Sequence, residues 1–329
     1  MNSFGRLFRI SIFGESHGKS IGVVIDGCPA GLPISGEDFL EDLSRRKSGA
    51  KGTTPRTESD RPNLLSGIFD GKTTGAPLAI VFENANTKPR DYENLRTQPR
   101  PGHADFVAVH KFGGFGDFSG GGHFSGRLTL ALVAAGVIAK KIIRPVTISS
   151  KLLKVGGSAD IQQTIKKAMA EGDSVGGLIE CTANNLPIGL GEPFFDSVES
   201  LISHVIFSIP AIKGIEFGSG FAAAAMRGIK HNDAIINSNG KTSTNNAGGI
   251  NGGITNGNDL VFRVAVKPTS SIGKSQLTYN FEKNAIDELT VVGRHDACIA
   301  LRVPPVIEAA TAIVLADLML LEQKVKRVV

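Results

Sequence analysis

The sequence predicts an α+β fold in which helices lie buried between two antiparallel sheets. Two segments, 126–143 (GRLTLALVAAGVIAKKII) and 305–323 (PVIEAATAIVLADLMLLEQ), have helical propensity but are apolar nearly all round. A helix without a polar face must be covered on more than one side. Residues 260–266 (LVFRVAV) alternate apolar and polar side chains, as a strand with one covered face does. Helices sandwiched between such sheets satisfy both patterns. A doubly wound fold would have the inverse arrangement, with the sheet buried between two outer layers of helices.

The beginning of the chain is predicted to be largely β. Short segments typical of strands, separated by glycine and proline turns, lie at 7–12 (LFRISI), 21–25 (IGVVI), 63–69 and 78–82.

A helix is expected between the second and third of these strands. Ser35, followed by Glu37 and Asp38, is typical of a helix start for the segment FLEDLSRRK. The basic end of this helix faces the negative end of its dipole. We expect the helix to deliver Arg45 and Arg46 together into the next loop.

Composition excludes several protein classes. With 329 residues, 41% of them hydrophobic and 20% charged, the chain is neither disordered nor fibrous, and it is long enough for one large domain or two. A net charge of +5 is mild for a nucleic-acid-binding protein. The three cysteines are far apart and predict neither a disulfide framework nor a zinc site. The longest apolar run, 128–139, is shorter than the roughly 20 residues of a membrane span. A soluble, cytoplasmic protein is expected, without a nucleic-acid or membrane partner.

Residues 113–122 (GGFGDFSGGG) hold six glycines in ten positions. A dinucleotide fingerprint needs G-x-G-x-x-G after a strand, but Ser119 occupies the last position and the preceding ADFVAVHKF is helical in character. The stretch instead leads into the buried helix at 126, where unpaired N–H groups attract anions. Ser125 can cap that helix. Arg127 in its first turn opposes the helix dipole, which favours an anionic ligand.

Two histidines lie in turns, His17 in FGESHGKS and His103 in RPGHAD. From spacing alone each is either solvent-exposed or catalytic. No HxxxH or HExxH pattern accompanies them, so no metal site is predicted. Basic residues crowd 45–61, and they either form a solvated surface or converge on a small polyanion.

Six motifs together resemble the chorismate synthase family. They run in the family's order along nearly the whole chain: GESHGKSIGVVIDG, RPGHAD, GGGHFSGRLT, AGGINGG, KPTSS and GRHDAC. The resemblance implies a lyase that converts 5-enolpyruvylshikimate 3-phosphate to chorismate and phosphate by 1,4-elimination, the last common step of aromatic amino acid biosynthesis. It implies reduced FMN as cofactor without net redox change, NADPH or a separate flavin reductase as source of electrons, and a homotetramer. It also implies a single β-α-β sandwich domain over 1–329, with glycine-rich active-site loops near 113–125 and 237–258 that become ordered around FMN.

The resemblance assigns roles to individual residues. His17 would protonate the departing phosphate, His103 would protonate or hydrogen-bond the reduced flavin, and Asp296 would act with flavin N5 to remove the C6 hydrogen. Arg294 and His295 are expected to hold Asp296 ionised. The implied flavin contacts are His123, Phe124, Ser125, Pro210, Ala211, Gly252, Lys267, Pro268, Thr269, Ser270, Ser271 and Arg294, and the implied substrate contacts are Ser16, Arg46, Lys51, Arg100 and Arg127.

The chain departs from the family pattern at three places. His123-Phe124 stands where Arg-Ser is common, Lys51 stands where an arginine is common, and the segment 143–171 is short. None of these changes touches His17, His103 or Asp296, so they bear on ligand affinity more than on activity. Two other functions are compatible with the glycine loops and arginines alone: a flavin-dependent oxidoreductase, and an anion-binding module without catalysis.

Overall fold

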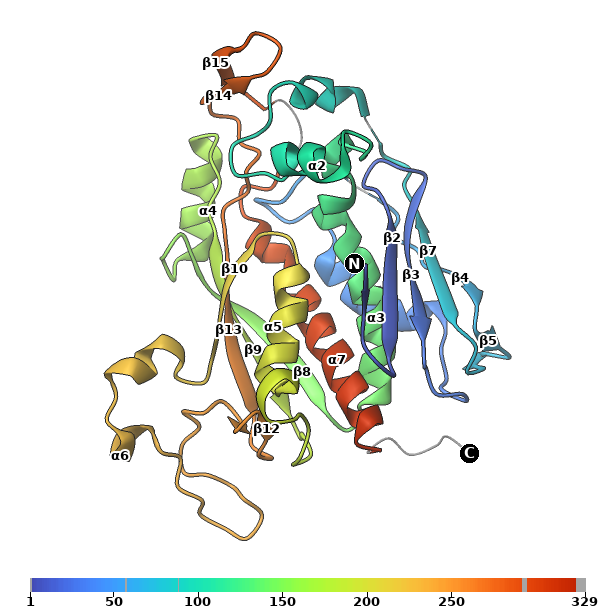
Figure 1. The fold of residues 1–329 in the computed structure, drawn as a ribbon, viewed down its shortest axis with the longest axis vertical. Helices are drawn as coiled ribbons and strands as arrows, with labels where there is room; N and C mark the ends of the chain where they lie inside the picture. The colour runs from blue at the N-terminus through green and yellow to red at the C-terminus, as the bar shows by residue number, and fades with distance from the viewer. Residues whose placement is uncertain (1, 57, 88, 292–294, 324–329) are drawn as a thin grey trace.

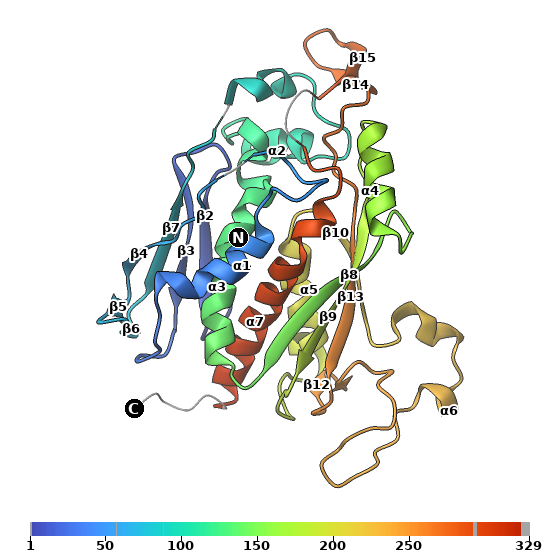
Figure 2. The same cartoon turned by 180° about the vertical axis from the view of Figure 1, so that it is seen from behind.

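Two antiparallel sheets enclose a layer of helices (Figures 1 and 2). The computed structural model describes residues 2–56, 58–87, 89–291 and 295–323. The first sheet has the strand order β1 (Ser3–Phe4), β2 (Arg9–Gly14), β3 (Ser20–Asp26), β7 (Leu78–Glu83) and β4 (Asn63–Ser66). The second has the order β10 (Ile212–Phe217), β13 (Leu260–Val266), β9 (Gly177–Asn184) and β8 (Thr147–Val155). The predicted fold class is therefore confirmed.

Three helices form the middle layer: α3 (Thr129–Ile142), α5 (Val198–Ser208) and α7 (Pro304–Leu321). α3 packs on the first sheet, α5 and α7 pack on the second, and α3 and α7 pack on each other. Gly136 allows that close approach, because a Cβ at this position would lie 2.3 Å from the Cβ of Ala309. Both predicted buried helices are confirmed, since nearly every residue of α3 and α7 is buried. α7 is long and apolar enough to cross a membrane, but 83% of it is buried inside the protein.

The remaining elements lie around this sandwich. Smaller helices are α1 (Leu40–Arg46), α2 (Asp105–Phe112), α4 (Ile161–Ala170) and α6 (Gly228–His231). Three small hairpins pair β5 (Ile68–Phe69) with β6 (Lys72–Thr73), β11 (Ile250–Asn251) with β12 (Ile254–Thr255), and β14 (Gln276–Asn280) with β15 (Ala285–Leu289). Figure 1 shows β12 and α6 at the opposite end of the molecule from α2.

Two carboxylates of the apolar helix α7 are buried, and both have partners. Asp317 accepts hydrogen bonds from the backbone N–H groups of Arg6 at 3.0 Å, Leu7 at 2.7 Å and Phe8 at 2.9 Å. This contact ties the N-terminal segment to the last helix. Because a buried carboxylate without such donors would be costly, the donors explain how Asp317 is tolerated in the core.

Glu308 is the centre of a buried ionic group, which we call the Glu308 cluster (Glu308, Asp42, Arg45, Lys140 and Ser150). Its carboxylate accepts from Arg45 at 2.6 Å, Lys140 at 3.1 Å and the Ser150 hydroxyl at 2.8 Å. Asp42 pairs with the same two cations. Burial would raise the pKa of Glu308, but the hydrogen bond from Arg45 and the charge of Lys140 outweigh it and lower that pKa.

One expectation about α1 is wrong. The helix begins close to Ser35, as predicted, through the short 3₁₀ turn Gly36–Phe39. Arg45 and Arg46, however, do not enter one loop together. Arg45 turns to the Glu308 cluster, whereas Arg46 is only 2% exposed and points into a cavity on the other side. Successive helix positions point about 100° apart, so neighbours in sequence can serve different sites.

Candidate active site

Two adjoining cavities lie where the glycine-rich segment meets the helical layer. The smaller has a volume of about 180 Å³ and the larger about 620 Å³. Both are lined by Gly120, Ser125, Gly126, Thr129, Ile209, Pro210, Thr269, Ser271 and Ile299. These shared walls make the two cavities neighbouring compartments of one site.

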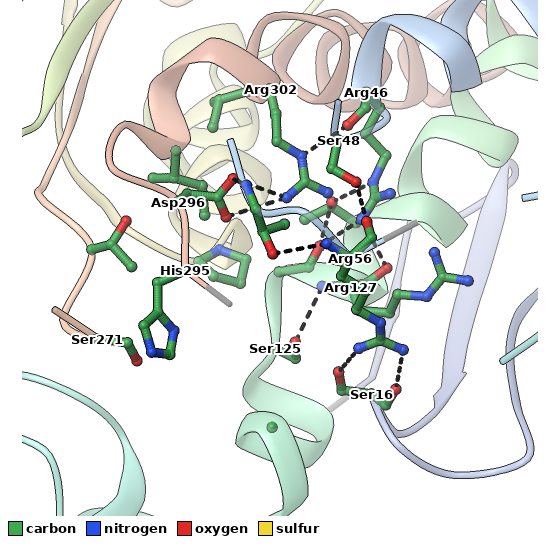
Figure 3. Close-up of a pocket in the computed structure, with 18 of the residues that line it drawn as sticks. Ser16, Arg46, Ser48, Arg56, Ser125, Arg127, Ser271, His295, Asp296 and Arg302 are labelled. Carbon is green, nitrogen blue, oxygen red and sulfur yellow. Dashed lines mark hydrogen bonds and ion pairs between the residues drawn. The ribbon is translucent and has the colours of Figure 1, made fainter. Parts of the chain in front are cut away.

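The smaller compartment, which we call the arginine cavity, is lined by more positive than negative groups (Figure 3). Five arginines face three carboxylates, and Asp105 pairs with one of the arginines from behind the wall, which leaves a formal excess of one positive charge. They are Arg46, Arg56, Arg100, Arg127 and Arg302 against Glu58, Asp60 and Asp296. Such an excess in a buried space favours an anionic ligand.

Arg46 and Arg127 form the deepest part of this cavity. Arg46 donates to the Thr129 hydroxyl at 3.0 Å and to the Gly126 carbonyl at 3.0 Å. Burial and the charges of Arg302 and Arg127 together lower the pKa of Arg46 to about 9, against the opposing effect of Asp60. Arg127 pairs with Asp60 and donates to Asn84, yet its buried Nη2 has no partner within the described part of the chain. An unpaired buried donor of this kind is a place for a ligand oxygen.

Asp296 is fixed at the cavity wall, but not by the predicted neighbours. Its carboxylate accepts the backbone N–H of Thr54 at 2.9 Å and two bonds from Arg302 at 3.2 Å. Arg294 lies outside the described residues. Burial is the main cause that lowers the pKa of His295, with Arg100 adding to it against a hydrogen bond to the Val291 carbonyl. Arg302, six residues further along the chain, is a cationic neighbour of Asp296 that the sequence did not predict.

His17 lies at the mouth of the arginine cavity, beside Gly120. A Cβ on Gly120 would come within 2.5 Å of the His17 ring, so only glycine fits there. Arg56 approaches His17 Nε2 at 3.3 Å and also donates to the Ser16 hydroxyl at 3.1 Å. Glu58 accepts from Arg56 at 2.8 Å and holds the guanidinium in place. His17 and Ser16 thus both border the space in which an anion would bind.

His103 lines the larger cavity next to Gly121. Its Nδ1 lies 2.6 Å from Asp105 Oδ1 and 3.0 Å from Arg100 Nη2. Arg100 makes two further bonds of 2.7 Å to Asp105 and one of 2.9 Å to the Ser271 hydroxyl. Burial would raise the pKa of Asp105, but the bonds from Arg100 and His103 outweigh it and hold that pKa well below its ordinary value.

The glycine triplet Gly120-Gly121-Gly122 makes this arrangement possible. The three residues have φ angles of 60°, 85° and 50°, in the left-handed region that favours glycine. A Cβ on Gly122 would lie 1.8 Å from the carbonyl oxygen of Asp117. Beyond the triplet, Ser125 Oγ accepts the N–H of Arg127 and caps the next helical turn, as predicted. The segment before the glycine-rich stretch 113–122 is helix α2, as predicted, and not the strand that a dinucleotide fingerprint follows.

Polar groups from the 267–271 segment line the larger cavity. Lys267 Nζ donates to Ser270 Oγ at 2.7 Å, and burial lowers the pKa of Lys267. The buried Thr269 Oγ1 has no partner among the described residues. His123, in the common arginine position, contacts the Gly14 carbonyl at 2.9 Å. The predicted residues that line this compartment are His103, His123, Phe124, Ser125, Pro210, Ala211, Lys267, Pro268, Thr269, Ser270 and Ser271.

Two predicted contacts lie apart from both cavities. Lys51 is exposed and lines neither of them. Gly252 lies in the β11–β12 hairpin and lines neither of them. The structure therefore does not bring either residue to the compartments that hold the other predicted contacts. Within the described ranges, no group of three or more His, Cys, Asp or Glu side chains could hold a metal ion.

Several site residues were not assigned a role from the sequence. Arg56, Glu58 and Asp60 lie in the basic stretch 45–61, whose alternating charges are equally typical of a solvated surface. Arg302 follows Asp296 by six residues, a spacing that a single helix would not place on one face. Asp105 stands inside the quoted motif RPGHAD, two residues after His103, and this adjacency was the available signal.

The chain is similar in sequence and fold to chorismate synthases. The family model described as chorismate synthase matches residues 8–320. A chorismate synthase of Chitinophaga pinensis is 65% identical over 329 residues, covering 100% of this chain and 99% of that protein. One of Dehalococcoides mccartyi is 47% identical over 360 residues, with the same coverage. A crystal structure of a chorismate synthase matches with a TM-score of 0.75 and 28% identity, covering 97% of this chain and 93% of that one.

Proposed function

The chain belongs to the chorismate synthase family, and on that premise we propose that it converts 5-enolpyruvylshikimate 3-phosphate to chorismate and phosphate with reduced FMN bound. The observation that carries the proposal is the arginine cavity. Its five arginines, its net positive charge and the unpaired Nη2 of Arg127 suit a small ligand with several negative groups. The proposed substrate has two carboxylates and a phosphate. Planar guanidinium groups bind such oxygens in bidentate fashion.

The larger cavity supports the flavin part of the proposal. Its volume of about 620 Å³ is in the range of small-molecule and cofactor sites. Lys267, Thr269 and Ser270 would donate to polar groups of FMN, and the unpaired hydroxyl of Thr269 is the clearest of these donors. Reduced FMN, when bound, would supply an electron-rich ring that assists loss of the phosphate without net redox change.

The side chains divide the proton transfers of a 1,4-elimination between them. The substrate loses its 3-phosphate and the hydrogen on C6, and the electrons of the C–H bond remain as part of the new double bond. His17, at the mouth of the arginine cavity, would give a proton to the departing phosphate. Asp296, held by Thr54 and Arg302, would accept the proton that leaves C6. His103 would hold the flavin by a hydrogen bond from the larger cavity.

The cellular context forms the second part of the proposal. We propose that residues 1–329 form one domain, that the protein is cytoplasmic and assembles as a homotetramer, and that the segments 113–125 and 237–258 become more ordered when FMN and substrate bind. Electrons would come from NADPH directly or through a separate flavin reductase.

An anaerobic turnover assay tests the proposed function. Purified protein is mixed with 5-enolpyruvylshikimate 3-phosphate and chemically reduced FMN, oxidised FMN, or oxidised FMN with NADPH, and chorismate and phosphate are quantified. Equal amounts of both products with reduced FMN, without flavin oxidation, are expected. One flavin oxidised per product would instead indicate an oxidoreductase. Ligand binding without any product would indicate an anion-binding module.

A further inference from the structure

His103, Asp105 and Arg100 form a hydrogen-bonded triad whose geometry determines where the imidazole carries its proton. Asp105 Oδ1 is close to two donors at once, Arg100 Nη2 at 2.7 Å and His103 Nδ1 at 2.6 Å. Asp105 Oδ2 accepts from Arg100 Nε at 2.7 Å and from the Arg100 backbone N–H at 3.1 Å. Both carboxylate oxygens are therefore fully used inside the protein.

The contact of 2.6 Å between Nδ1 and Oδ1 requires a proton between the two atoms. A guanidinium has only donors, and an ionised carboxylate has only acceptors. If Nδ1 carried no proton, its lone pair would face the carboxylate oxygen at 2.6 Å, which is repulsive. With a proton on Nδ1, the approach of Arg100 Nη2 to Nδ1 at 3.0 Å follows from the two donors sharing one acceptor.

The other ring nitrogen of His103 faces the larger cavity. A Cβ built on Gly121 would lie 3.4 Å from Nε2, so glycine leaves room at this point of the wall. Within the described ranges of the chain, Nε2 makes no hydrogen bond, and His103 is among the residues that line the cavity. The lowered pKa of Asp105 keeps the carboxylate ionised, so its interaction with Nδ1 persists over the ordinary pH range.

We infer that Asp105 is a positioning residue that holds His103 as the Nδ1–H tautomer and directs Nε2 at the ligand in the larger cavity. Neutral His103 thus presents Nε2 as a hydrogen-bond acceptor, and the imidazolium presents it as a donor. The effect on turnover rests on the proposed function, in which His103 contacts the reduced flavin. The tautomer does not depend on it.

The first test measures the tautomer in the free protein. The seven histidines are labelled with ¹⁵N, and the signal of His103 is identified by its loss in His103→Gln. Spectra are recorded at about pH 8.5, above the ordinary histidine value. The Nδ1–H form is expected in the wild type. In Asp105→Leu, Nδ1 has no carboxylate acceptor and Arg100 remains beside it as a donor, so the proton should move to Nε2. An Nε2–H ring in the wild type, or an unchanged tautomer in Asp105→Leu, would overturn the inference.

The second test measures coupling in turnover. Asp105→Leu, which removes the acceptor for Nδ1–H, is expected to lower turnover about 10²-fold, the lower end of what a placed proton-transfer group contributes. If Asp105 acts through His103, the same substitution in a His103→Gln background should lower turnover by less than about threefold. The two losses do not add when both residues act through one imidazole. Asp26→Asn, which removes an exposed ion pair with Arg9, is the control and should not change turnover. Additive losses would contradict the positioning role. The expected tautomer without chorismate formation would count against the proposed function, not against this inference.

Discussion

The Glu308 cluster and the arginine cavity bury charges in two different ways, although adjacent residues of α1 contribute to both. Arg45 belongs to the cluster, where two cations meet two carboxylates and Glu308 has a partner for each oxygen. Arg46 belongs to the cavity, where five cations meet three carboxylates and Arg127 Nη2 is unpaired. A balanced network has a partner for each of its charges within the protein. An unbalanced one is complete only with an anion, so charge balance distinguishes the structural cluster from the candidate site.

The largest expected difference is in chemistry. Asp296→Asn keeps the shape of the side chain but removes the basic oxygen, so single-turnover phosphate release should fall about 10²- to 10⁴-fold. FMN and substrate titrations of the same variant should remain near the wild-type values, because Arg302 and the backbone of Thr54 can still donate to the amide oxygen. Unchanged phosphate release would mean that another group takes the proton.

Removing the centre of the Glu308 cluster should mainly affect stability. Glu308→Ala leaves Arg45 and Lys140 with Asp42 alone of the two carboxylates of the cluster, so the free energy of unfolding should fall by about 1–3 kcal/mol. Urea denaturation followed by circular dichroism measures this value. Asp26→Asn, at an exposed ion pair, should change it by no more than about 1 kcal/mol and serves as the control. A loss as small as that of the control would remove the contrast between the two regions.

Ligand-induced stabilisation should depend on the arginine cavity alone. Arg127→Lys keeps one charge near Asp60 but loses the fork that carries the unpaired Nη2. At a substrate concentration of 100 times the wild-type Kd, stabilisation is about 2.7 kcal/mol, and a tenfold weaker variant retains about 1.4 kcal/mol. Thermal unfolding with and without substrate measures both values. Arg45→Lys, in the Glu308 cluster, should lower basal stability and leave the ligand-induced increase unchanged. An equal loss of that increase in both variants would contradict the distinction.

The smallest expected effect is a pH dependence of the Glu308 cluster. The folded pKa of Glu308 is lowered from the ordinary 4.5, so its contribution to stability is present above that value and is lost as pH falls through the folded pKa. Each unit of this lowering corresponds to about 1.4 kcal/mol. The difference in urea midpoint between wild type and Glu308→Gln should therefore shrink between pH 5 and the acid limit of folding. A constant difference over that range would show that the charge of Glu308 is not its source.

The layered fold could be predicted because its signal is local in the sequence. The segments 126–143 and 305–323 have no polar face, and 260–266 alternates, so burial on two sides and on one side follow from composition alone. α5 was not predicted, although its buried residues Val198, Ile202, Val205 and Ile206 follow the spacing of a one-faced helix.

The candidate site could be predicted only in part. His17, His103 and Asp296 stand in recognisable motifs, and the structure brings all three to the two cavities. Side-chain direction is set by tertiary packing, so the sequence could not separate Arg46 from Arg45 or show that Arg302 holds Asp296. Lys51 illustrates the converse, because a basic residue in the right stretch can still point to solvent.

The contact between Asp317 and the N-terminal segment bears on how the protein folds as it is made. Asp317 lies 311 residues after Arg6, and its helix α7 forms the middle layer between the two sheets. Every strand of both sheets precedes α7 in chain order, so β8 and β9, on which α7 packs, leave the ribosome before that helix does. Contacts of such sequence separation form slowly, and exposed apolar faces promote association in the meantime. The sandwich can therefore close only after α7 has been synthesised, and until then the apolar faces of β8 and β9 lack this helix as a cover.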